Sequence, residues 1–213
     1  TKIRMIEHAT GPVAVDTEIV PLGGISVAFR GMPNGFYFGI THAGSHNLTT
    51  IQLDRLIRAL YSREALVFHN SPHDLAVLED AGFPYTGKFY DTMLMAHWVN
   101  EERFNYSLDA ISLAYGGRPK EKPKLMQDLI DQDGWDSIPF KMMEEYSSHD
   151  AWITMQAFDK IEEEFFAEFT EELWQVEQDF IREVIIPMKR RGVRLDLEFS
   201  IREYMRGTAI MED

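Results

Sequence analysis

Three short motifs, far apart in the chain, carry acidic residues at intervals that fit one strand and two helices. Asp16 and Glu18 lie two residues apart, so both side chains project from the same face of a strand. Tyr146 and Asp150 lie four residues apart, which places them side by side on a helix. Asp74 stands between these pairs, four residues after an asparagine. We therefore expect a fold that brings the end of a strand and two helices to one place.

Four carboxylates at one place need a partner of opposite charge. Like charges repel and raise each other's pKa, so Asp16, Glu18, Asp74 and Asp150 are unstable together without a cation. Hard divalent cations prefer oxygen ligands. Two such ions side by side can activate a water molecule and stabilise a leaving oxygen in phosphoryl transfer. We expect these four residues to bind two divalent ions, Mg²⁺ or Mn²⁺.

The composition fits a folded protein and excludes several functions. The chain has 213 residues, 45% of them hydrophobic, which suffices for one sizeable domain or for one domain and part of another. Without cysteine it has no disulfide, zinc thiolate site or cysteine nucleophile, and a cytoplasmic setting is expected. We expect no membrane span and no signal peptide in the first ten residues. A net charge of -14 argues against coating of nucleic acid, but it allows an enzyme that grips a few phosphates.

The pattern of apolar residues predicts a mixed sheet flanked by helices. Short apolar or alternating runs predict five strands, at residues 12–15, 24–29, 36–40, 65–68 and 89–91. Helical spacing marks residues 50–60, and a second helix is expected to begin with Ser71 as its N-cap and Pro72 at its first position. From Thr92 onward the sequence indicates helices, with breaks at Gly116–Gly117 and near Gly134. This order of strands and helices is typical of a mixed α/β architecture.

Taken in order, the motifs resemble those of the DEDD exonuclease superfamily. Its pattern is D-x-E, then N-x-x-x-D, then either Y-x-x-x-D or H-x-x-x-x-D. Position 145 is Glu rather than His, so the chain resembles the tyrosine branch, which includes ribonuclease D and the proofreading domain of family A DNA polymerases. Three further stretches resemble the polymerase group: D-T-M-L within residues 90–96, S-L-D within residues 107–111, and the basic helix end and G-V within residues 185–196.

This resemblance implies a fold, a division of the chain and a reaction. The fold would be RNase H-like (DnaQ-like exonuclease), with residues 1–168 as the 3'-5' exonuclease domain. Residues 169–213 would be the helical start of a truncated polymerase domain on the thumb side. The substrate would be the 3' end of single-stranded or frayed DNA, and a polymerase domain would follow in the same full-length chain. The family usually has a longer loop after D-T-E with an apolar wedge, so we assign no wedge residue among Ile19 to Leu22.

The resemblance also implies a role for each site residue. Asp16, Glu18 and Asp150 would hold one ion, Asp16 would bridge to the second, and Asp74 would act mainly through its water shell. Tyr146 would position the attacking water, since a phenol with a pKa near 10 is a poor base at neutral pH. The expected catalytic residues are Asp16, Glu18, Asp74, Tyr146 and Asp150. The expected substrate-binding residues are Thr17, Asn70, Lys120, Lys122 and Lys124.

Simpler interpretations stand beside these. Ser71 and Asp74 also fit a helix-capping arrangement. The basic loop at residues 118–124 fits a solvated surface loop as well as it fits a phosphate contact. For the whole chain, the alternatives are a ribonuclease D-like enzyme that trims RNA and a catalytically silent exonuclease fold that only supports a polymerase.

Overall fold

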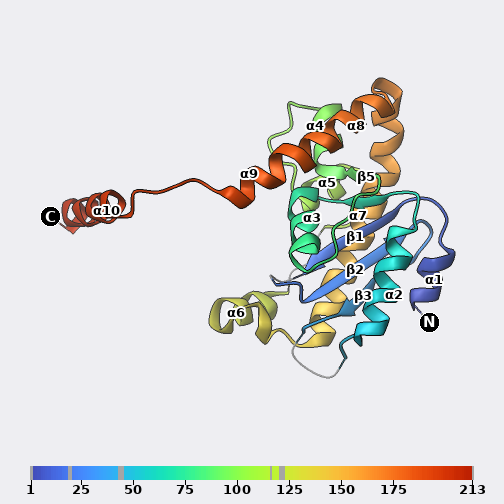
Figure 1. The fold of residues 1–213 in the computed structure, drawn as a ribbon, viewed down its shortest axis with the longest axis horizontal. Helices are drawn as coiled ribbons and strands as arrows, with labels where there is room; N and C mark the ends of the chain where they lie inside the picture. The colour runs from blue at the N-terminus through green and yellow to red at the C-terminus, as the bar shows by residue number, and fades with distance from the viewer. Residues whose placement is uncertain (1, 19–20, 43–45, 116, 120–122, 213) are drawn as a thin grey trace.

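The computed structural model describes residues 2–18, 21–42, 46–115, 117–119 and 123–212. A mixed five-stranded sheet lies at the centre of the molecule, in the order β3-β2-β1-β4-β5 (Figure 1). β1 pairs antiparallel with β2 and parallel with β4, so the strand that carries the first acids is central. The strands are β1 (Val13–Glu18), β2 (Gly24–Phe29), β3 (Phe36–Gly39), β4 (Leu66–Phe68) and β5 (Phe89–Asp91). The predicted mixed sheet is confirmed.

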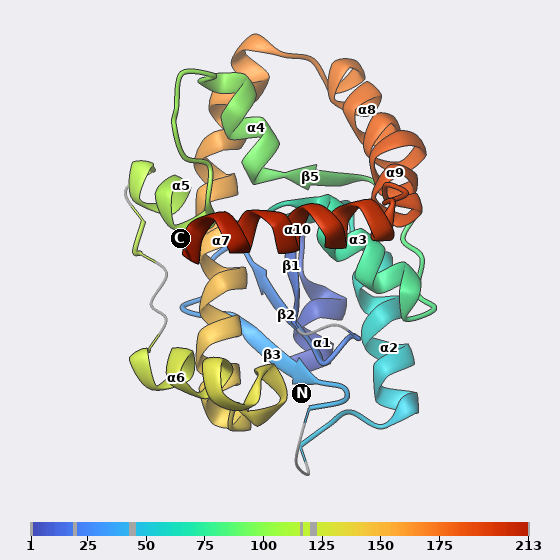
Figure 2. The same cartoon turned by 90° about the vertical axis from the view of Figure 1, so that its left-hand side faces the viewer.

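Helices cover both faces of this sheet (Figure 2). One face packs against α4 (Thr92–Val99), α5 (Leu108–Ala114) and α7 (Phe140–Glu168). The other packs against α1 (Lys2–His8), α2 (Thr50–Tyr61) and α3 (Ser71–Asp80). Because both faces are covered, β1 needs an apolar run with no solvent-facing residue, and Val13, Ala14 and Val15 are fully buried.

The long helix α7 approaches the β2–β3 hairpin so closely at Gly35 that no side chain fits at this position. A β-carbon added to Gly35 would lie 2.3 Å from the carbonyl oxygen of Ser148 on α7. Trp152, also on α7, donates a hydrogen bond from Nε1 to the carbonyl oxygen of Met32 at 2.8 Å. These two contacts fix the height of α7 above the sheet, and with it the position of every side chain that α7 turns toward β1.

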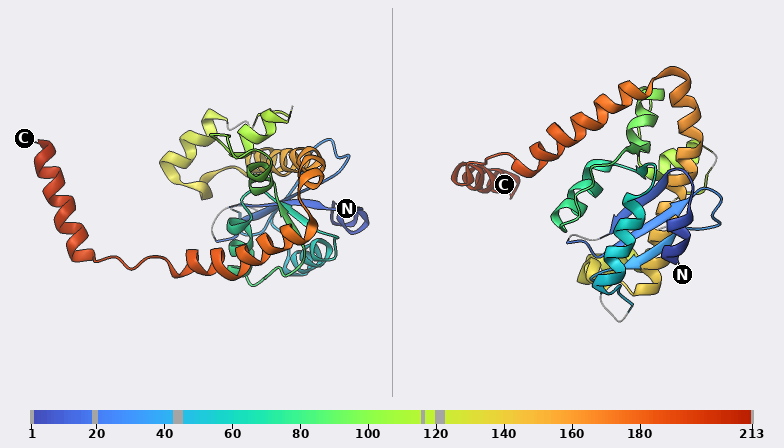
Figure 3. Two further views of the ribbon diagram at one scale, coloured as in Figure 1. Left: turned by 90° about the horizontal axis from the view of Figure 1, so that it is seen from above. Right: turned by 45° about the vertical axis from the view of Figure 1, so that its right-hand side comes forward.

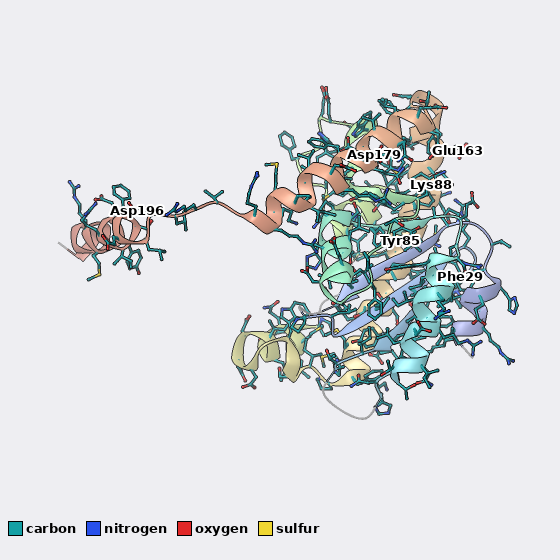
Figure 4. The ribbon with its side chains drawn as sticks, in the orientation of Figure 1. Phe29, Tyr85, Lys88, Glu163, Asp179 and Asp196 are labelled. Atoms are coloured by element: carbon teal, nitrogen blue, oxygen red, sulfur yellow. The ribbon has the colours of Figure 1, made fainter. Side chains whose placement is uncertain are left out.

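The chain beyond α7 first wraps around the β5 edge and then leaves the body of the molecule. The remaining elements are α6 (Lys124–Asp133), a 3₁₀ turn (Trp135–Ser137), α8 (Glu171–Phe180), a π-helical turn (Ile181–Ile185), α9 (Ile186–Arg191) and α10 (Leu197–Glu212). Figure 4 labels Lys88 before β5 and Asp179 on α8, where the two segments lie together. The two views of Figure 3 show α10 well apart from the sheet. No helix in the described ranges is both long and apolar enough to cross a lipid bilayer.

One expectation about local structure was wrong, and one helix was not predicted. The N-cap of α3 is Asn70 rather than Ser71, so Ser71 and Pro72 both lie inside the first turn. Asn70 adopts the left-handed conformation with φ 71°, which asparagine tolerates better than most residues. The helix α1 was not expected from the sequence, although it buries Ile3 and Ile6 against the sheet.

Candidate active site

Three of the predicted acids meet where β1 passes under α7. Successive residues of a strand face opposite ways, so Asp16 and Glu18 share the α7 face with Ala14. Asp150 comes to the same place from α7. One carboxylate oxygen from each of Asp16, Glu18 and Asp150 lies within 4.8 Å of the others. The strand that carries Asp16 and Glu18 and the helix that carries Asp150 thus bring their carboxylates to one place.

The chemistry of this carboxylate triad suits a hard divalent cation. Glu18 is 7% exposed and Asp150 is 2% exposed, so water screens their repulsion poorly. Three oxygen donors within 4.8 Å fit the oxygen ligand sets of Mg²⁺ and Mn²⁺. Among the described residues, no other group of three or more histidine or acidic side chains has its ligand atoms within 4.8 Å of one another. A bound cation would supply Lewis-acid stabilisation of phosphoryl oxygens at this point.

Asp74 reaches the same strand from its opposite side. Thr17 lies between the two β1 acids in sequence and therefore turns toward α3, where Asp74 is 1% exposed. The Oδ1 atom of Asp74 accepts hydrogen bonds from the backbone N–H and the Oγ1 hydroxyl of Thr17, each 2.8 Å long. The carboxylate therefore ties α3 to β1, and the interpretation of Asp74 as a helix cap is wrong.

The pKa of Asp74 is raised well above its ordinary value. Burial is the largest cause, and the charge of nearby Asp16 adds to it, while the hydrogen bonds from Thr17 act in the opposite direction. Asp74 does not belong to the triad within 4.8 Å, but it lies close enough to Asp16 for the charge of Asp16 to raise its pKa. Whether Thr17 also contacts substrate stays a prediction, since the structure gives its hydroxyl a bond to Asp74.

Asp91 is a positioning residue that the sequence analysis did not single out. It is fully buried at the end of β5, and its carboxylate accepts hydrogen bonds from the backbone N–H groups of Asn70 (3.1 Å) and Ser71 (2.6 Å). It also caps α4 by accepting from the N–H groups of Met93 and Leu94. The carboxylate thereby holds the left-handed turn that begins α3 and leaves the Asn70 side chain exposed beside Asp74. The acid of the D-T-M-L stretch was the only sequence signal for it.

Tyr146 lies one helical turn before Asp150 on α7 and is 8% exposed. It belongs to a small apolar cluster with Tyr37, Met126 and two further side chains, which fixes the position of its ring. Burial raises the pKa of Tyr37, and the charge of Glu18 raises it further, so this cluster borders the triad. The proposed contact of Tyr146 with the attacking water stays a prediction.

The basic loop is described only in part. Lys120 and Lys122 lie outside the described residues, and exposed Lys124 begins α6. Arg118 lines a hollow of about 490 Å³ together with Tyr146 and Trp152 of α7. Arg118 and Pro123 of the loop thus lie beside the helix that carries Asp150. The three lysines remain predicted substrate contacts.

The segment after Glu18 offers no wedge residue in its described part. Ile19 and Val20 lie outside the described residues, whereas Leu22 is 4% exposed and belongs to the core on the α3 side of the sheet. A core residue cannot press against a terminal base, so Leu22 is not assigned as a wedge.

Comparison with known proteins defines the class to which this fold and site belong. Residues 2–165 match the family model described as 3'-5' exonuclease, and the chain belongs to this family, which is that of the DNA polymerase A exonucleases. The chain is 27% identical over 201 residues to DNA polymerase I of Borreliella burgdorferi, covering 93% of this chain and 22% of the relative. It is 28% identical over 137 residues to DNA polymerase I of Chloroflexus aurantiacus, covering 62% of this chain and 14% of the relative. The chain thus spans less than a quarter of each polymerase.

A solved structure with a similar fold is Escherichia coli RNase D, an exoribonuclease. It superimposes with a TM-score of 0.63 at 18% identity, covering 90% of this chain and 48% of that chain. At this identity the likeness concerns the fold alone. The sequence relatives therefore favour the polymerase group, as the D-T-M-L and S-L-D stretches predicted.

Proposed function

We propose that this chain removes nucleoside monophosphates from the 3' end of DNA as the proofreading part of a family A DNA polymerase. The single observation that carries the proposal is the triad of Asp16, Glu18 and Asp150, complete in a chain that belongs to the 3'-5' exonuclease family. A single-stranded or frayed 3' end is the substrate, because a paired terminus cannot separate its last nucleotide to enter the site. We propose a cytoplasmic setting, from the absence of cysteine.

Each site residue has a distinct part in the proposed hydrolysis. Two Mg²⁺ ions, when bound, would activate water and stabilise the leaving 3' oxygen. Asp16, Glu18 and Asp150 would hold the first ion, Asp16 would bridge to the second, and Asp74 would bind the water shell of the second. Tyr146 would orient the attacking water through its hydroxyl group. Asn70, exposed at the start of α3, would contact the terminal nucleotide beside Asp74.

The rest of the molecule is part of the same proposal. Both curated relatives are DNA polymerase I, so we propose that a polymerase domain belongs to the same full-length protein and that residues 169–213 lead into it. The lysines at positions 120, 122 and 124 would bind phosphates near the hollow beside α7. A ribonuclease D-like RNA trimmer shares the fold and is the second candidate. A silent exonuclease fold is disfavoured because all four acids and Tyr146 are present.

The deciding experiment follows cleavage of 5'-labelled DNA and RNA strands of one sequence in Mg²⁺. We expect stepwise shortening of the DNA strand, with the RNA strand cut more slowly. Asp16→Ala should abolish nearly all cleavage, because a bridging metal ligand supplies several kcal/mol of charge stabilisation. Asp54→Ala, which removes an exposed acid on α2, is the matched control. Faster cleavage of RNA would favour the trimming enzyme, and no cleavage of either strand would favour the silent fold.

Metal binding can be measured separately from cleavage. Mg²⁺ should raise the melting temperature of the wild-type chain, because a ligand that binds only the folded state stabilises it. The rise should disappear in an Asp16/Asp150 double alanine variant. Calorimetric titration should count two ions per chain, and a count of one would remove the two-ion part of the proposal.

A further inference from the structure

The C-terminal end of α9 is strongly basic in a chain whose net charge is -14. Four of the six residues from 189 to 194 are lysine or arginine, and none of the six is acidic. We call Lys189, Arg191 and Arg194 the α9 cationic end. All three side chains are exposed. Within the described part of the chain, none of the three has a recorded ion pair with an acidic side chain.

The fourth cation, Arg190, fixes this end against α3. Its Nη1 atom lies 2.7 Å from Glu79 Oε1, and its Nη2 atom lies 2.6 Å from Asp80 Oδ1. Nη2 also donates to the backbone carbonyl of Ala76 at 3.3 Å. Three acceptors in the last two turns of α3 thus hold one guanidinium. These contacts therefore anchor α9 to α3, the helix whose first turn holds Asp74.

Lys189 extends the positive charge along α3 toward the triad. It lies close enough to His73 that its charge, after burial, is the second cause that lowers the pKa of that imidazole. His73 immediately precedes Asp74 in the first turn of α3. In Figure 1, β1 ends on the side of the molecule from which α9 and α10 extend, and in Figure 2 α9 is seen beside α3. The end of β1 and the helix α9 thus lie on the same side of the molecule.

We propose that the α9 cationic end binds the sugar-phosphate backbone of a single strand, a few nucleotides before the 3' end that the triad holds. This inference rests on the proposed exonuclease function. A helix of ten residues, the length of α3, is about 15 Å long, which equals about four nucleotides of a stacked strand at about 3.4 Å each. Exposed cations without acidic partners can exchange counter-ions for phosphates, which favours binding.

The α9 cationic end would reduce the electrostatic repulsion between this acidic protein and a nucleic acid strand. A polyanionic strand is repelled by a chain of charge -14, and four of the acids that contribute to this charge belong to the proposed site itself. In the basic loop, the described residues Arg118 and Pro123 line the hollow beside α7 and not the α3 side of β1. The α9 cationic end supplies positive charge there, on an element that Arg190 holds in place.

The test compares the triple variant K189Q/R191Q/R194Q with the wild-type chain on oligothymidylates of two and ten nucleotides. Arg190 is kept, so that the contacts between α9 and α3 survive. The matched control R4Q/R58Q/K160Q removes three exposed cations from α1, α2 and α7 and changes the net charge equally. Circular dichroism and melting temperature establish that all three proteins are folded alike. Strand binding is also measured without cleavage, by fluorescence anisotropy of the labelled ten-nucleotide strand in EDTA.

We expect the triple variant to lose most of the preference for the longer strand. The ratio of kcat/KM between ten and two nucleotides should fall about tenfold at low salt, while the control keeps the wild-type ratio. The slope of log affinity against log salt should fall by about 2, because single strands release about 0.7 counter-ion for each neutralised phosphate. Equal length ratios and equal salt slopes in variant and wild type would overturn the inference. So would the absence of strand binding by the wild-type chain.

The outcome separates this inference from the proposed function. A wild-type chain that binds the strand in EDTA but cleaves nothing in Mg²⁺ refutes the exonuclease proposal. The anisotropy comparison between the triple variant and the control then still decides whether the α9 cationic end binds the backbone.

Discussion

At the scale of single residues, Asp74 is held in an environment that opposes its own charge. The side chain is 1% exposed and lies near Asp16, and these two conditions raise its pKa. Among the described residues, Thr17 compensates for this with its two hydrogen bonds to the Asp74 carboxylate. A charged carboxylate in such a position destabilises the protein unless an opposite charge is brought close to it.

Asp74→Asn should therefore stabilise the protein in EDTA. The asparagine oxygen can still accept both hydrogen bonds from Thr17, whereas the repulsion with Asp16 disappears. A gain of 1 kcal/mol raises the melting temperature of a chain of this size by about 2–4 °C, and we expect a rise of about 2–8 °C near neutral pH.

The pH dependence of this gain has a definite sign. When the pKa of a carboxyl is raised in the folded state, the free energy of unfolding of the protein falls as pH rises through that pKa. The wild-type chain is therefore destabilised toward neutral pH, whereas the Asp74→Asn variant is not. The difference in melting temperature should shrink as pH falls toward the ordinary pKa of aspartate. A variant less stable than the wild type in EDTA at pH 7 would contradict this account.

Tyr146→Phe should slow hydrolysis and leave Mg²⁺ affinity nearly intact. The ring would stay in its apolar cluster with Tyr37 and Met126, and only the hydroxyl would be lost. A group that positions a reacting proton contributes about 10²–10⁴-fold, which sets the expected loss. Asp150→Asn is the comparison, since it should weaken Mg²⁺ binding as well as the rate. Full activity in the phenylalanine variant would remove Tyr146 from the mechanism.

At the scale of elements, the site depends on how closely α7 approaches the sheet. Gly35 and the carbonyl of Ser148 define this approach, and Tyr146 and Asp150 lie within two residues of that contact. The helix therefore cannot rise above the hairpin without carrying a triad member away from β1.

Gly35→Ala should reduce both stability and activity. The new methyl group would lie 2.3 Å from a backbone oxygen, which cannot move aside as a flexible side chain can. Overpacking of this kind costs about 1–3 kcal/mol. Gly207→Ala on α10, where no atom lies within 4 Å, is the control and should lose neither. Thermal melting and Mg²⁺ titration of both variants measure the effect. Wild-type metal affinity in the Gly35→Ala variant would show that the triad does not depend on this contact.

The sequence predicted those parts of the site that arise within a single element. The intervals from Asp16 to Glu18 and from Tyr146 to Asp150 are properties of a strand and of a helix, so they could be recognised before any fold was known. The contacts from Thr17 to Asp74 and from Asp91 to Asn70 join elements that are distant in sequence, and no local pattern encodes them. Asparagine and serine are equally common N-cap residues, so the local sequence could not decide between Asn70 and Ser71.

At the scale of the whole molecule, the segment after α7 belongs physically to the edge of the sheet. Trp174 on α8 is fully buried and donates a hydrogen bond from Nε1 to the carbonyl oxygen of Phe89 at 2.7 Å. Gln178, also fully buried, accepts from the backbone N–H of Phe89 at 2.9 Å. α8 thereby pairs with the open edge of β5, which would otherwise expose unsatisfied backbone groups. The domain boundary after residue 168 remains a prediction.

Trp174→Ala gives a direct test of that boundary. If α8 is part of the cooperative unit of the sheet, the variant should lose about 3–5 kcal/mol, the usual cost of removing a buried aromatic side chain. Leu173→Ala, at a side chain that is 39% exposed, should change stability far less. Chemical denaturation monitored by circular dichroism measures both. A loss below about 1 kcal/mol in the Trp174 variant would support a separate unit beginning at residue 169.

The triad also has an order of assembly in time. A ribosome releases the chain from its N-terminus, so β1 emerges with Asp16 and Glu18 long before α7 brings Asp150. Until then the nascent chain has only two of the three carboxylates of the triad. The triad is therefore incomplete until Asp150 of α7 has been made. A partly made copy that ends before this helix lacks the complete cation site that the proposed hydrolysis would need.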